Sequence, residues 1–479
     1  MTVGLENCHT ELVESIVGRL DVTDVGSLRL TSRCLRSKAS QGHFRSYFRS
    51  KRVKVSSPHL EDFEVVTRRG SLGCEIRDLT LVGVVRDTNR LEAAVETRPE
   101  DAESKRHLQI LQERQQDYEQ SKDSGLIVRR LSDAFKNIAA NGVAGKLHSL
   151  SLEVAECRID AQRQFPPTGG EGWRLIWQSA AETFRIVFSA LQKSRLQLDH
   201  LNLFNGSHLY QCSIASNELS IIDYSADPLS QTLGSVRSLS ISVSDRILDI
   251  TQASSGWADE SDWSGSDDGE EEEEEPDVEA LMTDAREENN FTGLAGLIHA
   301  CQNLKILHIH QYGVNRRRLD SRVAIPSELI FQRGIATLNT LPPIEECLLC
   351  GVFLRESDML AFLERSSKTL RALTMKTVTM VNGSFRPVFD YIASRIPNLD
   401  HLYLDELMVG EELVHFTGVG QPRFHTWVGA HGSNTLRRAG NEEAQQPVPY
   451  HLPTGAPQPV GSPEMKKWLQ DQRREYGPP

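Results

Sequence analysis

Two short groups of metal-binding residue types stand out in the sequence. Cys347 and Cys350 form a single C-x-x-C pair, and His308 and His310 flank one isoleucine. A structural zinc site takes four ligands, normally two such pairs or one pair with two histidines. The cysteines fall in an apolar segment that predicts a buried strand, where a thiol acts as a small apolar side chain. Alternation places both histidines on one strand face without a third ligand, so we expect no bound metal.

Motifs for nucleotide binding or hydrolysis are absent from the sequence. It contains no G-x-x-x-x-G-K-[ST] loop, no G-x-S-x-G elbow and no H-E-x-x-H pair. Gly418-Val419-Gly420 is half of a dinucleotide-binding fingerprint, but it lacks the third glycine and lies in a polar region. The sequence therefore predicts no catalytic residue and no cofactor, and we expect the chain not to be an enzyme.

Composition predicts an intracellular protein. Of the 479 residues, 39% are hydrophobic and 25% are charged, as in ordinary globular domains. The first residues do not resemble a signal peptide, no apolar run is long enough for a membrane span, and the eight cysteines are scattered. We expect a soluble protein with reduced thiols, in the cytoplasm, the nucleus or both.

The net charge of −13 comes from one segment. Residues 256–290 contain 16 acidic residues and one arginine, which leaves about +2 on the rest of the chain. By contrast, residues 28–54 contain nine Lys/Arg and no acid. Such a basic stretch favours an acidic partner, or it is simply a solvated face.

Residues 1–55 predict a small helical unit. Thr10 and Thr23 are placed to cap a first and a second helix, and a third follows around Leu35. Apolar residues recur in the first helix at helical spacing, at Leu12, Val13, Ile16, Val17 and Leu20. Three short helices bury little apolar surface, so a unit of this kind usually packs on a partner.

An apolar triplet spaced L-x-x-L-x-L recurs between residues 70 and 410. Its members are Ile76-Leu79-Leu81, Leu147-Leu150-Leu152, Leu198-Leu201-Leu203, Val236-Leu239-Ile241, Leu304-Leu307-Ile309, Ile344-Cys347-Leu349, Leu370-Leu373-Met375 and Leu399-Leu402-Leu404. The last two positions alternate as in a strand, and most triplets follow a segment with helical spacing. A repeated helix–turn–strand unit predicts a mixed α/β solenoid.

Three regions interrupt or follow this pattern. Residues 86–124 are highly charged and predict a loop or a protruding solvated helix. Residues 252–290, with an uninterrupted acidic run at 270–275, predict a disordered insert. Residues 411–479, rich in glycine, proline and polar residues, predict a largely disordered tail.

A further set of N-terminal residues has the spacing of a known module. It comprises Glu11-Leu12, Ile16, Leu20, Thr23-Asp24-Val25 and the run Leu28-Arg29-Leu30-Thr31-Ser32-Arg33, followed by an aromatic stretch at 43–48. This pattern resembles the fungal form of the F-box, the module that binds a Skp-type subunit of cullin ubiquitin ligases. The family usually opens with L-P-x-E-L, whereas this chain has Cys8-His9-Thr10-Glu11-Leu12 and lacks the proline that pre-sets the first helical turn.

The resemblance implies an adaptor that presents a protein target to the ligase. The adaptor-binding residues it implies are Cys8, Leu12, Ile16, Leu20, Val25, Leu28 and Leu30. Residues 70–410 resemble the divergent leucine-rich repeats found behind such F-boxes, although the usual Asn or Cys after the strand is not regular. The implied partners are a Skp-type adaptor with its cullin complex and an unknown protein substrate, without membrane or nucleic acid.

Other functions fit the same patterns. A protein-interaction scaffold outside any ligase would use the same helical unit and solenoid, and the missing proline favours it. A small helical cap that only shields the end of the solenoid is a further alternative. Nucleic-acid binding through residues 28–54 would weaken steeply with salt, but few aromatic residues are interleaved there and the insert is acidic.

Overall fold

The computed structural model describes residues 4–142, 144–157, 173–206, 212–246, 278–312, 327–417, 423–425, 429–452 and 462–476. The chain divides into two compact units, which are described separately. The first unit comprises Met1–Ser213, Tyr224–Ile241 and Ala300–Leu304, and the second comprises Ile214–Asp223, Ser242–His299 and Lys305–Pro479. The half-fingerprint at 418–420 lies outside the described residues, as does most of the acidic insert, 252–277.

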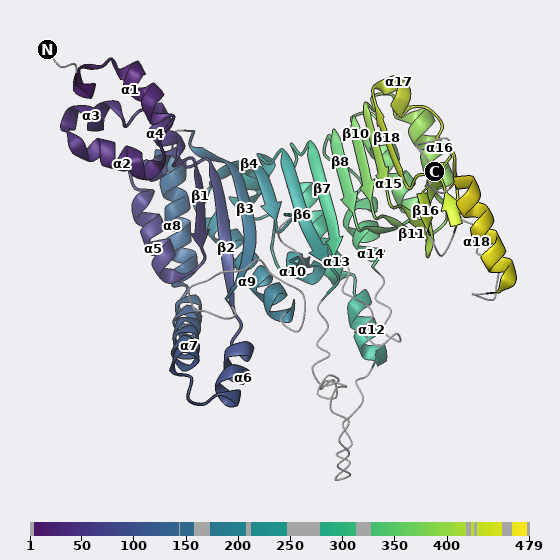
Figure 1. The fold of residues 1–479 in the computed structure, drawn as a ribbon, viewed down its shortest axis with the longest axis horizontal. Helices are drawn as coiled ribbons and strands as arrows, with labels where there is room; N and C mark the ends of the chain where they lie inside the picture. The colour runs from purple at the N-terminus through teal and green to yellow at the C-terminus, as the bar shows by residue number, and fades with distance from the viewer. Residues whose placement is uncertain are drawn as a thin grey trace, which may run out of the picture. The chain divides into compact units, whose positions relative to one another are not determined.

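The first unit is built on parallel strands in the order β1, β2, β3, β4, β6 (Figure 1). Their bounds are β1 Ser50–Lys54, β2 Asp78–Arg86, β3 Lys146–Cys157, β4 Gln197–Leu203 and β6 Ser238–Ser244. Because β1 pairs with β2, residues 50–54 belong to the sheet and not to the N-terminal helical unit, which ends a few residues earlier than the sequence predicts.

The first unit also contains helices, of which the first five precede β1 and the others follow it in the chain. They are η1 Leu5–Asn7, α1 Thr10–Val17, α2 Val22–Thr31, α3 Arg33–Lys38, α4 Gly42–Ser46, α5 Ser57–Val66, η2 Leu72–Glu75, α6 Asn89–Thr97, α7 Ala102–Asp123, α8 Leu126–Asn141, α9 Trp173–Ser194 and α11 Leu229–Gly234. Helix α9 approaches β2 closely, because a Cβ at Gly83 would lie 2.2 Å from Thr183 Oγ1. Gly83 therefore sets the contact between helix and sheet.

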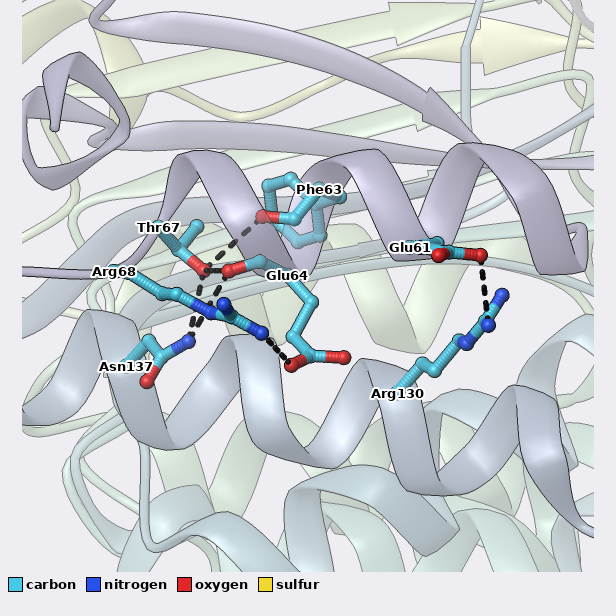
Figure 2. A network of polar contacts seen from close by, with 7 residues as sticks. All are labelled: Glu61, Phe63, Glu64, Thr67, Arg68, Arg130 and Asn137. Carbon is cyan, nitrogen blue, oxygen red and sulfur yellow. Dashed lines mark hydrogen bonds and ion pairs between the residues drawn. The ribbon is translucent and has the colours of Figure 1, made fainter.

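A polar network joins α5 to α8 (Figure 2). Arg130 of α8 forms an ion pair with Glu61 at 2.8 Å. It also donates a hydrogen bond to the Ser57 carbonyl at 2.7 Å. The Asn137 amide donates to the Glu64 carbonyl at 3.3 Å. Arg130 thus holds the first turn of α5, and Asn137 holds a later one.

The second unit has parallel strands in the order β7, β8, β10, β12, and β18 pairs antiparallel with β12. These strands are β7 Ile306–Tyr312, β8 Glu346–Cys350, β10 Ala372–Lys376, β12 His401–Asp405 and β18 Thr435–Ala439. A smaller sheet runs in the order β14, β13, β11, β9. Its strands are β9 Phe353–Arg355, β11 Thr379–Asn382, β13 Met408–Val409 and β14 Glu412–Leu413.

The remaining elements of the second unit are shorter strands and helices. The strands are β5 Ile214–Ala215, β15 His415–Phe416, β16 Arg423–His425, β17 Gly429–His431 and β19 Tyr450–His451. The helices are α10 Ser216–Leu219, α12 Val278–Arg286, α13 Asn289–Ala300, α14 Leu329–Phe331 with the π-helical turn Gln332–Ala336, α15 Glu356–Ser366, α16 Phe385–Arg395, α17 Asn441–Ala444 and α18 Pro463–Tyr476.

The recurring apolar triplets form the core of the sheet in each unit. Every triplet residue is buried, and the last two of each lie in a strand, as the sequence predicts. Equivalent residues of neighbouring strands are also paired in register: Leu79 with Leu150, Leu150 with Leu201, Leu201 with Leu239, Leu307 with Cys347, Cys347 with Leu373, and Leu373 with Leu402. The triplet therefore indicates which residues are buried and also which residues of neighbouring strands are equivalent.

The same type of turn follows three successive strands of the second unit. Gly351, Thr377 and Glu406 come directly after β8, β10 and β12, with φ of 67°, 52° and 51°. The Gly351 amide donates to the Lys376 carbonyl at 2.9 Å, and the Thr377 amide donates to the Asp405 carbonyl at 2.8 Å. Each left-handed residue turns the chain from the large sheet into the small one.

Part of the region 411–479 is built into the fold, although its composition predicts a disordered tail. Strand β18 is hydrogen-bonded to β12, and Val414, Phe416 and Leu436 are buried. These few apolar residues are spaced among glycine, proline and polar residues, so composition alone hides them. Because β18 pairs with β12, it covers backbone groups that would otherwise form an open sheet edge.

The two predicted insertions differ from each other. Residues 86–124 are mainly the helices α6 and α7, which agrees with the helical alternative, and Leu111 of α7 packs with Leu91 and Cys157. The end of the predicted acidic insert is also helical, because α12 begins at Val278 and α13 at Asn289. Among the described residues, no helix combines the length and apolar character needed to cross a membrane.

Candidate protein-interaction surfaces

Helix α1 carries apolar side chains on two faces. Val13 and Val17 are buried, whereas Leu12 is 57% exposed and Ile16 is 37% exposed. Leu12 and Ile16 are four residues apart and so lie on the same side of the helix. The internal packing of the helical unit uses one valine face and leaves the Leu12–Ile16 face to solvent.

The N-terminal helices share one small core. It consists of Val13, Val17, Val25, Leu35, Ala39 and Phe44, with Cys8, Leu20, Leu28 and Phe48 packed against it. The Arg29 guanidinium lies over the Phe44 ring, 3.9 Å from its centre. Burial, followed by the charge of Arg36, lowers the pKa of Arg29. The core is therefore closed by a stacked arginine as well as by apolar contacts.

Backbone-directed hydrogen bonds fix the start of this unit. The Lys38 ammonium donates to the carbonyls of Glu6 and Cys8, both at 2.7 Å. The Tyr47 hydroxyl donates to the Leu20 carbonyl, and the Glu14 carboxylate accepts from the His43 amide. These contacts hold α1, and with it the exposed Leu12–Ile16 face, against α3 and α4.

The helix caps differ from the prediction. Helix α1 begins at Thr10 itself, and its cap residue His9 makes no side-chain capping bond. Helix α2 is capped by Asp21, whose carboxylate accepts the Asp24 amide at 2.8 Å, so Thr23 lies inside the helix. The prediction of caps at Thr10 and Thr23 was wrong: the cap residues are His9, directly before Thr10, and Asp21, two residues before Thr23 and in the extended conformation that a cap needs.

The seven adaptor-binding residues implied by the resemblance fall into three classes. Leu12, Ile16 and Leu30 are exposed, with Leu30 at 89%. Cys8, Leu20 and Leu28 are half-buried against the core. Val25 is fully buried and belongs to the internal packing, so it does not contribute to an exposed surface. Val25 and Leu28 are three residues apart on α2, and this spacing alone does not predict which of them is buried in the core of the unit.

Two exposed apolar residues lie in the same unit but were not singled out from the sequence. Leu5 of η1 is 45% exposed and Val22, the first residue of α2, is 46% exposed. Both are isolated apolar residues at the ends of helical elements. Neither residue belongs to a run of apolar residues at helical spacing, so the sequence pattern did not indicate that they contribute to a surface. Their exposure is known only from the structure.

Several arginines of the basic stretch have acidic partners in the first unit. Arg45 pairs with Glu75 at 3.1 Å and Arg52 pairs with Glu153 at 3.0 Å. Both arginine side chains remain about half exposed, so solvent screens these pairs. Arg33 and Arg36 on α3 are exposed. The helical unit therefore carries exposed positive charge as well as exposed leucines.

A second candidate surface is the outward face of the strands in the second unit. His308, Leu348, Thr374 and Tyr403 are neighbours in register, and each is half-buried. His308 contacts the Glu346 carboxylate at 3.0 Å, and Lys376 lies 5.1 Å from the Tyr403 ring centre. The face thus combines aromatic, apolar and charged groups on a rigid sheet.

The outward histidines are engaged in local contacts. In the first unit, the His148 and His200 rings lie 4.5 Å apart, and burial, followed by His148, lowers the pKa of His200. In the second unit, His310 Nδ1 lies 3.0 Å from the Ser242 hydroxyl, and burial lowers its pKa. These lowered values favour neutral imidazoles at neutral pH.

The C-x-x-C pair is split by the strand that carries it. Cys347 is fully buried and Cys350, three residues later on β8, is half-buried on the other face. The two thiols therefore point away from a common centre. Among the described residues, no group of three or more His, Cys, Asp or Glu side chains is arranged to hold a metal ion.

No protein-family model and no curated protein sequence matches the chain. The two candidate surfaces rest on the packing, exposure and charge described above.

Proposed function

We propose that the protein is a substrate-recognition adaptor of a cullin-type ubiquitin ligase. In this proposal the N-terminal helices bind a Skp-type adaptor, and the sheet-bearing body, a leucine-rich-repeat-like solenoid, binds a protein target. Ubiquitin transfer would be carried out by other subunits, so the chain needs no catalytic residue. A place in the cytoplasm or nucleus belongs to the same proposal.

The observation that carries the proposal is the exposed Leu12–Ile16 face of α1. Two aliphatic side chains one helical turn apart are left in water by a unit whose core already has other residues. Burying each against a partner would gain roughly 1.5–3 kcal/mol for a fully covered side chain. Leu30, at 89% exposed, adds a second apolar contact on α2.

Charge supports a partner of acidic character. The stretch from residue 28 to 54 carries nine basic residues and no acid, and Arg33 and Arg36 of this stretch are exposed. Skp-type adaptors are acidic, as the family resemblance implies. Complementary charge of this type mainly speeds association and sets orientation.

The repeated unit supports the role of the body. In each unit, equivalent apolar residues of neighbouring strands pair with one another, so similar helix-and-strand modules stack side by side. Stacked modules present long rows of outward side chains, and His308, Leu348 and Thr374 form such a row. Rows of this kind suit the recognition of a folded protein surface.

A scaffold without any ligase is the alternative, and one observation favours it. His9 stands where the F-box family has proline, and it caps α1 without a side-chain hydrogen bond. A first turn without these stabilising features frays more readily. Adaptor affinity would then be too low for function, although the solenoid would still bind its target.

Co-purification of the full chain with a Skp-type adaptor tests the proposal. The chain is expected to retain the adaptor, and Leu12→Asp combined with Ile16→Asp is expected to abolish retention. Val65→Asp is the matched control, because Val65 is an apolar residue on α5 that is 50% exposed. Failure of the unaltered chain to retain the adaptor would favour the scaffold.

A further inference from the structure

A cavity of about 390 Å³ lies in the first unit at the carboxyl ends of β1, β2 and β3. Lys54, Arg86 and Cys157, the last residues of these strands, line it. The first turn of α5 forms one wall, and Leu111, Arg114 and Tyr118 of α7 form another. Carboxyl ends of parallel strands are the usual place for ligand binding in open α/β sheets.

Positive charge converges on this cavity. Lys54, Arg86 and Arg114 line it against one carboxylate, that of Asp117. Partial burial, followed by Lys54, lowers the pKa of His59 at the same wall; Arg114 and Arg86 act in the same direction and Asp62 opposes them. The lining therefore has a net positive charge of about two, without counting His59.

Among the lining residues, Arg86 gives the strongest indication of anion binding. Its guanidinium is half-buried, and among the described residues it contacts the Gln115 amide at 3.4 Å and the Tyr118 ring at 5.4 Å but no carboxylate. Burial, the largest influence, lowers its pKa, and Arg114 acts in the same direction, whereas Glu119 opposes them. A partly buried cation without a carboxylate in direct contact is unfavourable, and a bound anion would supply that contact.

Helix α5 adds backbone donors to the same wall. It begins at Ser57, directly beyond β1, and its cap residue Ser56 makes no side-chain capping bond. The Ser56 hydroxyl instead lies 2.8 Å from His59 Nδ1. Pro58, the second residue of this turn, has no amide N–H, so the amides of Ser57 and His59 are the first-turn donors left for an anion. Arg130 holds this turn in place through the Ser57 carbonyl.

The size and walls of the cavity define the rest of the ligand. A volume near 390 Å³ exceeds that of a single phosphate and falls in the range of about 300–1,000 Å³ typical of small-molecule sites. Val84, Leu111 and the Tyr118 ring give it apolar walls. We propose that this cavity binds a small organic phosphomonoester, with the phosphate between Arg86, Lys54 and the first turn of α5 and the organic group against Val84, Leu111 and Tyr118.

Calorimetric titration of the full chain with phenyl phosphate, inorganic phosphate and phenol tests this proposal. Near pH 8 phenyl phosphate is a dianion, since the second pKa of a phosphate ester is about 6. Phenyl phosphate is expected to bind saturably and more tightly than inorganic phosphate, and phenol is expected not to bind. Absence of saturable phenyl phosphate binding would overturn the proposal. If a phosphoserine peptide, titrated in the same way, bound and phenyl phosphate did not, the ligand would be a phosphorylated protein and the proposal would also be overturned.

Variants of the lining identify the site. Arg86→Met is expected to weaken phenyl phosphate at least about tenfold, because a charge-assisted contact is lost. Lys54→Met, another change in the lining, is expected to weaken phenyl phosphate binding several-fold and replaces Arg86→Met if that variant does not fold. Lys51→Met is the control, because Lys51 is exposed on β1 and does not line the cavity. Equal affinity in all three variants would place binding elsewhere and contradict the proposal.

Thermal unfolding provides a second readout. Without ligand, Arg86→Met is expected to melt at or above the temperature of the unaltered chain, because the change removes a half-buried charge that has no carboxylate in direct contact. Phenyl phosphate is expected to raise the melting temperature of the unaltered chain and of Lys51→Met but not of Arg86→Met. A similar rise in Arg86→Met would contradict the proposed site. The proposal does not depend on the adaptor role, because it concerns other residues.

Discussion

The Arg29 guanidinium carbon lies 3.9 Å from the centre of the Phe44 ring, which joins α2 to α4. The same side chain donates from Nε to the Ser40 hydroxyl at 2.9 Å. Phe44 is 2% exposed, so the arginine covers an aromatic ring that would otherwise border solvent. The Arg29 side chain therefore links α2 to α4 at the edge of the small core against which α1 packs.

Replacing Arg29 by methionine is expected to destabilise the N-terminal helices by about 1–2 kcal/mol. The change keeps an apolar stem but removes the cation–π contact and the hydrogen bond. Amide hydrogen exchange of α2 and α4 would show correspondingly faster local opening. Arg33→Met, at an exposed position of α3, is the control and should leave exchange unchanged. Equal exchange in the two variants would contradict a structural role for Arg29.

The in-register apolar rows predict a large difference between neighbouring positions of β10. Leu373 is fully buried between Cys347 and Leu402, so Leu373→Ala should cost about 2–5 kcal/mol of unfolding free energy. Thr374 faces outward and is half-buried, so Thr374→Ala should cost less than about 1 kcal/mol. Urea unfolding measures both, and similar costs would mean that the strand has a different register.

The turn after β8 predicts a difference between two glycines that share a left-handed conformation. A Cβ at Gly351 would lie 2.5 Å from the Gln311 carbonyl oxygen, whereas nothing lies within 4 Å of one at Gly410. Gly410→Ala should cost about 1 kcal/mol from backbone strain, and Gly351→Ala should cost at least twice as much. Chemical unfolding that gives equal losses would contradict the close approach of β8 to the Gln311 backbone.

Burial predicts the order in which the cysteines react. Burial raises the pKa of Cys301 to about 12 and that of Cys347 still further. The thiolate is the reactive form, so both should resist iodoacetamide at pH 8 in the folded protein. Cys34 is exposed and should be alkylated first. Peptide mapping after a short labelling pulse checks the order, and early labelling of Cys347 would show that β8 opens readily.

The strand core could be predicted from the sequence because one signal was repeated. Each triplet repeats the same burial pattern, and helix residues such as Phe135, Phe188 and Phe389 recur at the spacing of a buried helix face. The structure adds that equivalent triplet residues pair in register, as Leu373 does with Cys347 and Leu402. Local periodicity was therefore sufficient wherever a segment has one apolar face.

The rest required three-dimensional packing. Strand β18 shows little periodicity, because only Leu436 in it is fully buried, and its partner β12 lies some thirty residues away. The cavity brings Lys54, Arg86 and Arg114 together from three separate segments, and no local motif connects them. Val25 and Leu12 look alike in sequence, yet one is buried and the other exposed, because each short helix has apolar residues on more than one face.

The most direct test of the account is the affinity of the full chain for a purified Skp-type adaptor, measured by titration calorimetry. We predict saturable one-to-one binding that Leu12→Asp weakens at least about tenfold, by roughly 1.4 kcal/mol or more, and that Val65→Asp leaves unchanged. Absence of binding, or equal weakening by both variants, would contradict the assignment of the α1 face as the adaptor-binding surface.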